Sequence, residues 1–211
     1  MVHAASRSPV GESEKGSVVR PVTTGRDVTD AELVRRACQG DKWAEEMLYR
    51  RHAAFVLGVC SRLLRHVSDA EDVVQDAYVD AFEQLSDLRE PQLFRRWLMG
   101  IAVHKVRRRL RRRRLLRVLG LADSQQQQCL ESCLASGASP EVYADIVCLE
   151  HALRKLTDPS RVAWQLRYVE GYRLDEVAGL CHCSLATAKR RIADAEKRVH
   201  QVVHIEEIED G

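Results

Sequence analysis

The stretch LDEVAGLCHCSLATAKRRI, residues 174–192, has the spacing of a helix-turn-helix. Its first helix carries the small residue Ala178 where a second helix must cross closely. A three-residue turn, CHC, follows, and Ser184 is suited to cap the next helix. Val177 and Ile192 are placed to fill the core that the two helices share. The motif predicts a compact helical unit with one helix presented for recognition.

The N-terminal half of that second helix is a candidate DNA-reading surface. Its hydroxyl groups and cations can hold phosphates, and arginine can hydrogen-bond the edge of guanine. The candidate residues are Ser184, Thr187, Lys189, Arg190 and Arg191. The alternative is an ordinary helical hairpin with a solvated basic face, because this motif often occurs without DNA binding.

Charge is segregated along the rest of the chain, although the net charge is only +2. Residues 68–87 hold seven acids and no Lys or Arg, whereas residues 89–117 hold twelve Lys or Arg and one acid. This asymmetry predicts a basic face for nucleic acid beside an acidic face for another partner.

Two helices are predicted in these charged stretches. The first starts with a capping-box pattern at Ser68 and has apolar residues on one side and acids on the other. It lacks the i,i+4 cations usual on a solvated acidic face, which favours a basic protein partner over plain solvation. The second, about 92–115, ends in the basic run 107–114, which is too long to be explained by the helix dipole alone.

The whole chain is predicted to be all-α, with two helical domains. Aromatic residues are only 5%, and Gly and Pro are sparse in the periodic segments, which argues against a β-sandwich. Further helix starts are predicted at Thr29, Asp41, Ser139-Pro140 and Asp158-Pro159. The predicted divisions are a disordered leader (1–27), a first domain (28–118), a flexible linker (119–139), a helix-turn-helix domain (140–204) and an acidic tail (205–211).

Several classes of protein are excluded by the sequence. No apolar run approaches the ~20 residues of a membrane span, and the N-terminus lacks a secretory signal, so a cytoplasmic protein without membrane insertion is expected. The motifs G-x-S-x-G, Walker A and H-E-x-x-H are absent, so no enzyme is predicted. No cofactor is predicted either.

The seven cysteines are expected to be reduced. Cys181, His182 and Cys183, with Cys129 and Cys133, suggest zinc, but their spacing does not suit four converging ligands, and no metal site is predicted. The simpler interpretation is that the turn cysteines are small apolar residues that fill the core. The cysteines at positions 38, 60 and 148 lie on apolar stripes and are expected in the core.

Four segments together resemble the extracytoplasmic-function (ECF) group of bacterial sigma-70 family sigma factors. They are DAELV at 30–34 with GD at 40–41 and LY at 48–49, DAEDVVQD at 69–76, WLMGIA at 97–102 before the Arg-rich run, and LRYVEG at 166–171 leading into the helix-turn-helix. The resemblance covers residues 29 to about 203. The second segment is close to the family's motif for binding core polymerase.

The resemblance implies an alternative sigma factor that joins bacterial core RNA polymerase and recognises promoter DNA. The residues that would dock on the polymerase clamp are Asp69, Glu71, Asp72, Gln75 and Asp76. Those that would melt the −10 element and hold its strand are Arg89, Gln92, Arg95, Arg96, His104, Lys105 and Arg108. The helix from Ser184 would read the −35 element, and an anti-sigma factor would mask the polymerase-facing surfaces.

The chain departs from the family pattern at a few positions. His182 stands where the turn usually has Gly and favours a positive φ, which His adopts only at some cost. Ala188 replaces Val under the recognition helix, Asp194 stands where a basic or neutral residue is common, and His104 replaces a frequent Asn. Two other functions remain open: an autonomous helix-turn-helix regulator, and a metal- or redox-sensing regulator that uses the turn and linker cysteines.

Overall fold

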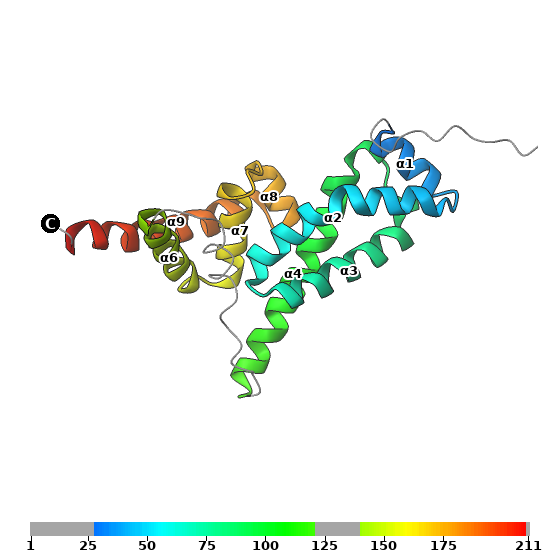
Figure 1. The fold of residues 1–211 in the computed structure, drawn as a ribbon. Coiled ribbons are helices and arrows are strands. Elements are labelled where there is room, and N and C mark those ends of the chain that lie inside the picture. Colours follow the sequence, from blue (N-terminus) through cyan, green and yellow to red (C-terminus); the bar gives the residue numbers. More distant parts are fainter. Residues whose placement is uncertain (1–27, 121–139, 210–211) are drawn as a thin grey trace, which may run out of the picture.

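The computed structural model describes residues 28–120 and 140–209, and every regular element in these two ranges is a helix (Figure 1). The helices are α1 (Asp30–Ala37), α2 (Lys42–Leu64), α3 (Val67–Glu83), η1 (Leu85–Asp87), η2 (Pro91–Leu93), α4 (Phe94–Val118), α6 (Pro140–Arg154), α7 (Asp158–Tyr168), α8 (Leu174–Leu180) and α9 (Leu185–Glu209). The all-α prediction with two groups of helices is confirmed. The predicted leader, most of the linker with Cys129 and Cys133, and the last two residues lie outside the described ranges.

Most helices begin where the capping residues in the sequence predict. The Thr29 hydroxyl accepts a hydrogen bond from the Glu32 amide (3.3 Å), and the Asp41 carboxylate accepts one from the Trp43 amide (3.0 Å). The capping box at Ser68 is wrong, because α3 already begins at Val67 and has no side-chain cap. Ser68 therefore lies inside the first turn.

Other helix ends also differ from the prediction. Thr157, rather than Asp158, precedes the first residue of α7. Residues 91–93 form a short 3-10 turn, so α4 begins at Phe94 and continues to Val118. Helix α9 continues to Glu209, because no Gly or Pro interrupts the chain before Gly211. The first part of the predicted acidic tail is therefore helical.

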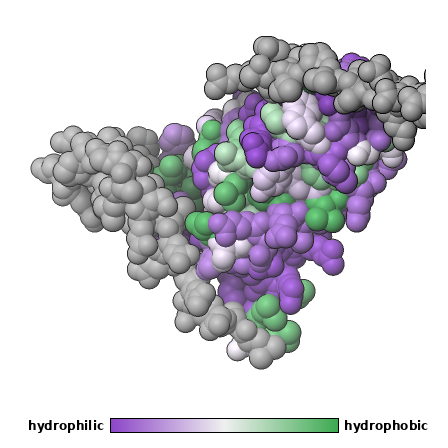
Figure 2. All heavy atoms as spheres, turned by 45° about the vertical axis from the view of Figure 1, so that its right-hand side comes forward, coloured by the Kyte–Doolittle hydropathy of each residue, from purple (hydrophilic) through white to green (hydrophobic). Residues whose placement is uncertain are grey.

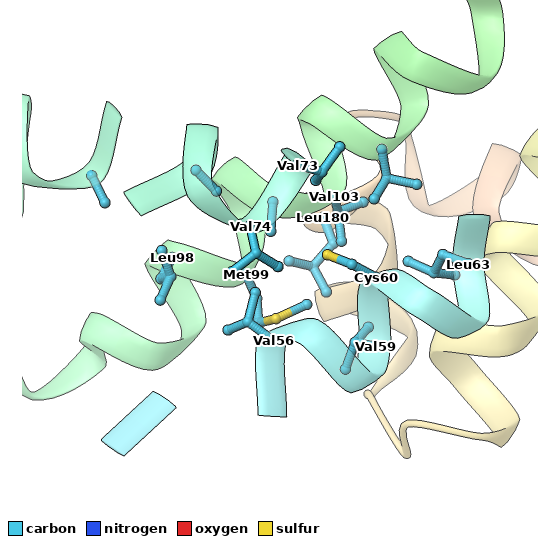
Figure 3. Packing of buried hydrophobic residues seen from close by; sticks show 14 of the residues in the cluster. Val56, Val59, Cys60, Leu63, Val73, Val74, Leu98, Met99, Val103 and Leu180 are labelled. Atoms are coloured by element: carbon cyan, nitrogen blue, oxygen red, sulfur yellow. The ribbon is translucent and has the colours of Figure 1, made fainter. Parts of the chain in front are cut away.

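One hydrophobic core connects the two groups of helices. Leu180 of α8 lies beside Cys60 of α2 and Val103 of α4, and Val162 and Leu166 of α7 belong to the same buried cluster (Figure 3). Figure 1 shows α7 and α8 beside the C-terminal end of α2 and the middle of α4. The sequence predicted two domains joined by a linker, but it did not predict that they pack against each other.

The surface is polar over most of the described part of the face shown in Figure 2, including much of the projecting end of α4. The tip of that helix exposes three apolar side chains, Leu115, Val118 and Leu119. Nothing between residues 28 and 120 or 140 and 209 forms a helix with the length and apolar composition needed to cross a bilayer.

The cysteines differ in burial. Cys60 is buried, as predicted, and Cys148 is half-buried. The prediction for Cys38 is wrong: this residue is exposed because α1 ends at Ala37, one residue before it.

Candidate functional site

Helix α3 presents four of the five predicted acidic-helix residues to solvent. Glu71, Asp72, Gln75 and Asp76 are all exposed, and we call them the acidic face. On the opposite side of the helix, Val73 and Ala77 are buried in the core. The acidic face is therefore accessible to a partner, and its one ion pair with another helix in the described part of the chain is the exposed pair of Asp72 with Arg109 of α4 at 3.3 Å.

The fifth residue, Asp69, has a different environment. It is only 8% exposed, and its carboxylate accepts a hydrogen bond from the Arg109 guanidinium at 2.5 Å and pairs with Arg113. Both arginines come from the basic end of α4. Asp69 thus holds α4 against α3, which sequence reasoning could not detect because it does not give the packing of the two helices.

We expect Asp69→Ala to lower the free energy of unfolding by roughly 1–3 kcal/mol. The substitution leaves two partly buried arginines without their shared carboxylate, and breaking such a pair is more costly than losing an exposed one. Urea unfolding would measure the change. Asp76→Ala, on the exposed side of the same helix, is the control and should change stability by no more than about 0.5 kcal/mol. Equal losses in the two variants would contradict the anchoring role of Asp69.

A cleft of about 730 Å³ is lined by the first half of α4, helix α8 with the turn after it, the end of α3 and residues 84–90. Of the predicted −10 residues, it brings together Arg89, Arg96, His104 and Lys105. We call this the α4 cleft. Trp97 and Ile101 also line it. Both belong to the segment WLMGIA, and the sequence did not indicate that they border a cleft.

The other predicted −10 residues do not line the α4 cleft. Gln92 donates a hydrogen bond to Glu90 (3.2 Å), and the Arg95 guanidinium lies 3.7 Å from the centre of the Phe55 ring. Arg108 is exposed further along α4. Lys105, inside the cleft, is paired with Asp80 at 2.7 Å. The predicted set is therefore divided between the cleft and the surface around it.

His104 meets the second half of the chain at the edge of the cleft. Its ring lies edge-on to that of His182, with the ring centres 5.6 Å apart. Partial burial lowers the pKa of His104 below its ordinary value, and His182 and the nearby Arg107 lower it further. The lowered pKa favours the neutral form of His104 in this contact, because a charged imidazole would add a cation beside Arg107.

The helix-turn-helix forms as its sequence predicts. Val177 and Ile192 are buried, and the Ser184 hydroxyl accepts a hydrogen bond from the Thr187 amide at 3.2 Å, which caps α9. His182 adopts a φ of +44°, the left-handed conformation expected where Gly is usual. The Cys183 amide closes the turn by donating to the Ala178 carbonyl at 3.0 Å.

The five candidate residues of the recognition helix are not equivalent. Lys189 and Arg190 are exposed, whereas Ser184 and Thr187 take part in the cap. Arg191 is half-buried, and one of its terminal nitrogens is buried without a hydrogen-bond partner in the described structure. Of the three cations in the set, Lys189 and Arg190 are therefore the two whose side chains are exposed to solvent.

Cys181 of the turn and Cys60 of α2 are core residues, whereas Cys183 of the turn is half-buried. Burial raises the pKa of Cys181 to about 11 and that of Cys60 to about 12, so both thiols stay protonated near neutral pH. Among the described residues, no three His, Cys, Asp or Glu side chains gather in a way that would hold a metal ion. These observations give no support to the metal- or redox-sensing hypothesis for Cys181.

Comparison with known families matches two parts of the chain. Residues 48–115, which include most of α2 and nearly all of α4, match the family model "Sigma-70 region 2". Residues 146–199, which include the helix-turn-helix, match "Sigma-70, region 4". The acidic face and the α4 cleft lie mainly in the first match, and the recognition helix lies in the second.

Curated relatives match over nearly their whole length. The chain is 30% identical to the RNA polymerase sigma factor NccH of Alcaligenes xylosoxydans over 174 residues, covering 81% of this chain and 92% of the relative. It is 28% identical to the ECF RNA polymerase sigma-E factor of Escherichia coli K12 over 185 residues, covering 83% and 95%. It is 26% identical to the RNA polymerase sigma-H factor of Pseudomonas aeruginosa over 180 residues, covering 82% and 93%.

Solved structures have the same fold. The structure of CnrH in complex with the cytosolic domain of CnrY gives a TM-score of 0.57 at 24% identity, covering 83% of this chain and 97% of that chain. The sigma factor RpoE of Bartonella quintana, solved with the anti-sigma factor NepR, also gives 0.57, at 18% identity, covering 76% and 96%. With both family regions present in order and relatives matched almost end to end, the chain belongs to the ECF group of the sigma-70 family and is an alternative sigma factor that binds core RNA polymerase and directs transcription initiation.

Proposed function

We propose that three surfaces of this sigma factor each make one of the contacts needed for transcription initiation. The acidic face of α3 docks on core polymerase, the α4 cleft and its surroundings bind the melted −10 element, and the recognition helix α9 reads the −35 element. The observation that carries the proposal is that Glu71, Asp72, Gln75 and Asp76 are exposed while the opposite side of α3 is buried. Asp69 contributes indirectly, by holding the basic end of α4 in place.

The α4 cleft suits a separated DNA strand. Arg89 and Arg96 line the cleft, and further cations follow along α4. They attract the phosphate backbone, an attraction that weakens with salt and must outweigh the repulsion from the four acids of the same cleft, Asp80, Asp87, Glu90 and Glu176. Trp97 offers a ring on which an unstacked base can pack, which commonly adds 1–3 kcal/mol per base. Arginine and aromatic groups are thus combined as single-strand binding requires.

The recognition helix suits a duplex major groove. The N-terminal residues of such helices contact base edges, while nearby side chains hold the backbone. Arg190 is the candidate base reader, and Lys189 is the candidate phosphate contact, because both are exposed near the start of α9. Arg191 supports the motif from inside, since part of its guanidinium is buried.

We also infer an anti-sigma partner and a cytoplasmic location. RpoE of Bartonella quintana, which has the same fold, was solved with an anti-sigma factor bound. An equivalent regulator for this chain would have to cover the acidic face or the α4 cleft. The role of the chain is binding and positioning, not catalysis.

Site-specific crosslinking in a reconstituted holoenzyme tests all three surfaces. A photoreactive side chain at Gln75 should label a polymerase subunit, one at Gln92 should label −10 DNA, and one at Lys189 should label −35 DNA. Glu46, exposed on α2, is the control position and should label none of these efficiently. If the holoenzyme transcribes but the Gln75 probe labels only DNA, the assignment of the acidic face is wrong.

A further inference from the structure

The C-terminal end of α4, residues 107–120, is supported by the rest of the fold on one side only, and we call it the α4 tip. Arg109 and Arg113 pair with Asp69 of α3. Leu110 is only 5% exposed, so this side of the helix packs on the body. The last turns of α4 extend away from the other helices (Figure 1). The opposite side of the α4 tip is therefore open to a partner.

This outward side carries arginines first and apolar side chains last. With 3.6 residues per turn, positions 108, 111, 112, 115, 118 and 119 lie on one side of the helix. All six side chains are exposed: Arg108, Arg111, Arg112, Leu115, Val118 and Leu119. The three apolar ones are 64%, 78% and 67% exposed, more than any other large apolar residue in the described ranges. Single exposed apolar residues are ordinary, but such a cluster indicates an interaction site.

The α4 tip is also strongly basic. Residues 107–120 hold eight arginines and no acid. Arg109 and Arg113 are occupied by Asp69, whereas five others are exposed to solvent: Arg108, Arg111, Arg112, Arg114 and Arg117. Figure 2 shows an apolar patch at the end of the projection, next to a strongly polar band. A partner must therefore offer negative charge and an apolar region side by side.

The surface of an anionic bilayer has both properties. Its headgroups attract Lys and Arg, and the boundary between headgroups and acyl chains accepts apolar side chains. At 1.5 Å per residue, Leu119 lies about 10 Å beyond Arg112 along the helix axis. Apolar groups of interfacial helices enter the bilayer by roughly 5–10 Å. The end of the α4 tip can thus enter the boundary while the arginines stay at the level of the lipid phosphates.

Nucleic acid and a second copy of the chain match the α4 tip less well. A DNA backbone would bind the arginines, but its phosphates offer no apolar surface to Leu115, Val118 and Leu119. A dimer formed through two such tips would bury the apolar side chains. It would also bring two clusters of arginines together, and like charges across an interface are unfavourable.

We propose that the α4 tip binds reversibly to the surface of membranes that contain anionic phospholipid. Leu115, Val118 and Leu119 enter the interface, and Arg111 and Arg112 contact headgroup phosphates. The contact is peripheral and reversible, because only a few apolar side chains enter the bilayer. The inference goes beyond the proposed function and does not depend on it.

Vesicle binding by the full chain tests the proposal. The wild type should bind vesicles of phosphatidylcholine with about 30% phosphatidylglycerol at least about 50-fold more tightly than vesicles of phosphatidylcholine alone. Arg111→Gln with Arg112→Gln should lower the affinity for the anionic vesicles roughly 20-fold, since each cation near such a surface contributes about fivefold. Leu115→Gln with Leu119→Gln should lower it by at least about tenfold, because less apolar surface leaves water.

Matched controls place the same substitutions elsewhere on the surface. Arg50→Gln with Arg154→Gln removes two exposed arginines from α2 and α6. Val79→Gln with Val169→Gln replaces two exposed apolar residues, on α3 and at the end of α7. Both control variants should bind anionic vesicles as the wild type does. Circular dichroism would verify the helix content of each variant, which glutamine, a good helix former, should preserve.

Several results would overturn the proposal. The wild type could fail to bind anionic vesicles, or the controls could lose as much affinity as the tip variants. A loss in the arginine variant alone, with none in the apolar variant, would indicate plain attraction between opposite charges. If vesicles are not bound but the arginine variant weakens binding to duplex DNA, the α4 tip is a nucleic-acid surface. If sedimentation velocity instead shows self-association that both tip variants abolish, its partner is a second copy.

Discussion

We expect the double variant Asp72→Lys, Asp76→Lys to bind core RNA polymerase with an affinity at least about 100-fold lower than that of the wild type, while its helix content stays the same. Like charges placed across a protein interface cost several kcal/mol, and two reversals on the acidic face create such contacts with a basic partner. Both side chains are exposed, and the only ion pair between helices that is lost in the described part of the chain is the exposed pair of Asp72 with Arg109 (3.3 Å), so folding should change little. Pull-down on core enzyme and a binding titration would measure the loss.

A matched control separates this effect from the change in net charge. Glu46→Lys with Asp175→Lys also reverses two exposed acids, but on α2 and α8, away from the acidic face. It should bind core enzyme as the wild type does. Wild-type affinity of the Asp72 and Asp76 double variant, or an equal loss in the control, would refute the acidic face as the polymerase contact.

We expect Arg190→Ala to relax the preference of the holoenzyme at one or two positions of the −35 element. An arginine that donates two hydrogen bonds to guanine gives about 1–3 kcal/mol of discrimination, or roughly 10- to 150-fold. Transcription from a set of promoters with single −35 substitutions would measure it. The preference at other positions should stay the same.

Lys189→Ala is the matched comparison for this prediction. Lys189 is exposed on the same turn of α9, and as a phosphate contact its loss should weaken all promoters alike and reduce the salt dependence. If Arg190→Ala leaves every base preference unchanged, the recognition helix presents a different residue to the groove.

The local features of this fold were predictable from sequence. The helix-turn-helix depends on spacing and capping within a short segment, and its Ser184 cap, buried Val177 and positive φ at His182 all formed as expected. The exposed side of α3 followed from the 3.6-residue period. Only Asp69 fell outside that pattern, because its burial depends on where the basic end of α4 crosses.

Features that depend on packing between distant segments were not predictable. Periodicity places Leu180 on the apolar face of its helix, but it does not show that Val103 and Cys60 lie opposite that face. Likewise, the sequence gives no sign that Arg161 and Gln165 differ from other polar residues of α7. Only the structure shows that they hydrogen-bond the end of α2. The α4 cleft and the packing of α7 and α8 against α2 and α4 were missed for the same reason: each is built from both halves of the chain.

The most direct test of polymerase-dependent promoter recognition is a salt-controlled binding titration of the free chain and of the holoenzyme. The duplex would be a promoter selected by the holoenzyme from a random library, compared with a scrambled version. We predict a strong preference for the promoter by the holoenzyme and only a weak preference by the free chain, in which no polymerase holds the two DNA surfaces at promoter spacing. A free chain that prefers the promoter by more than about a thousandfold, as autonomous repressors can, would contradict the account.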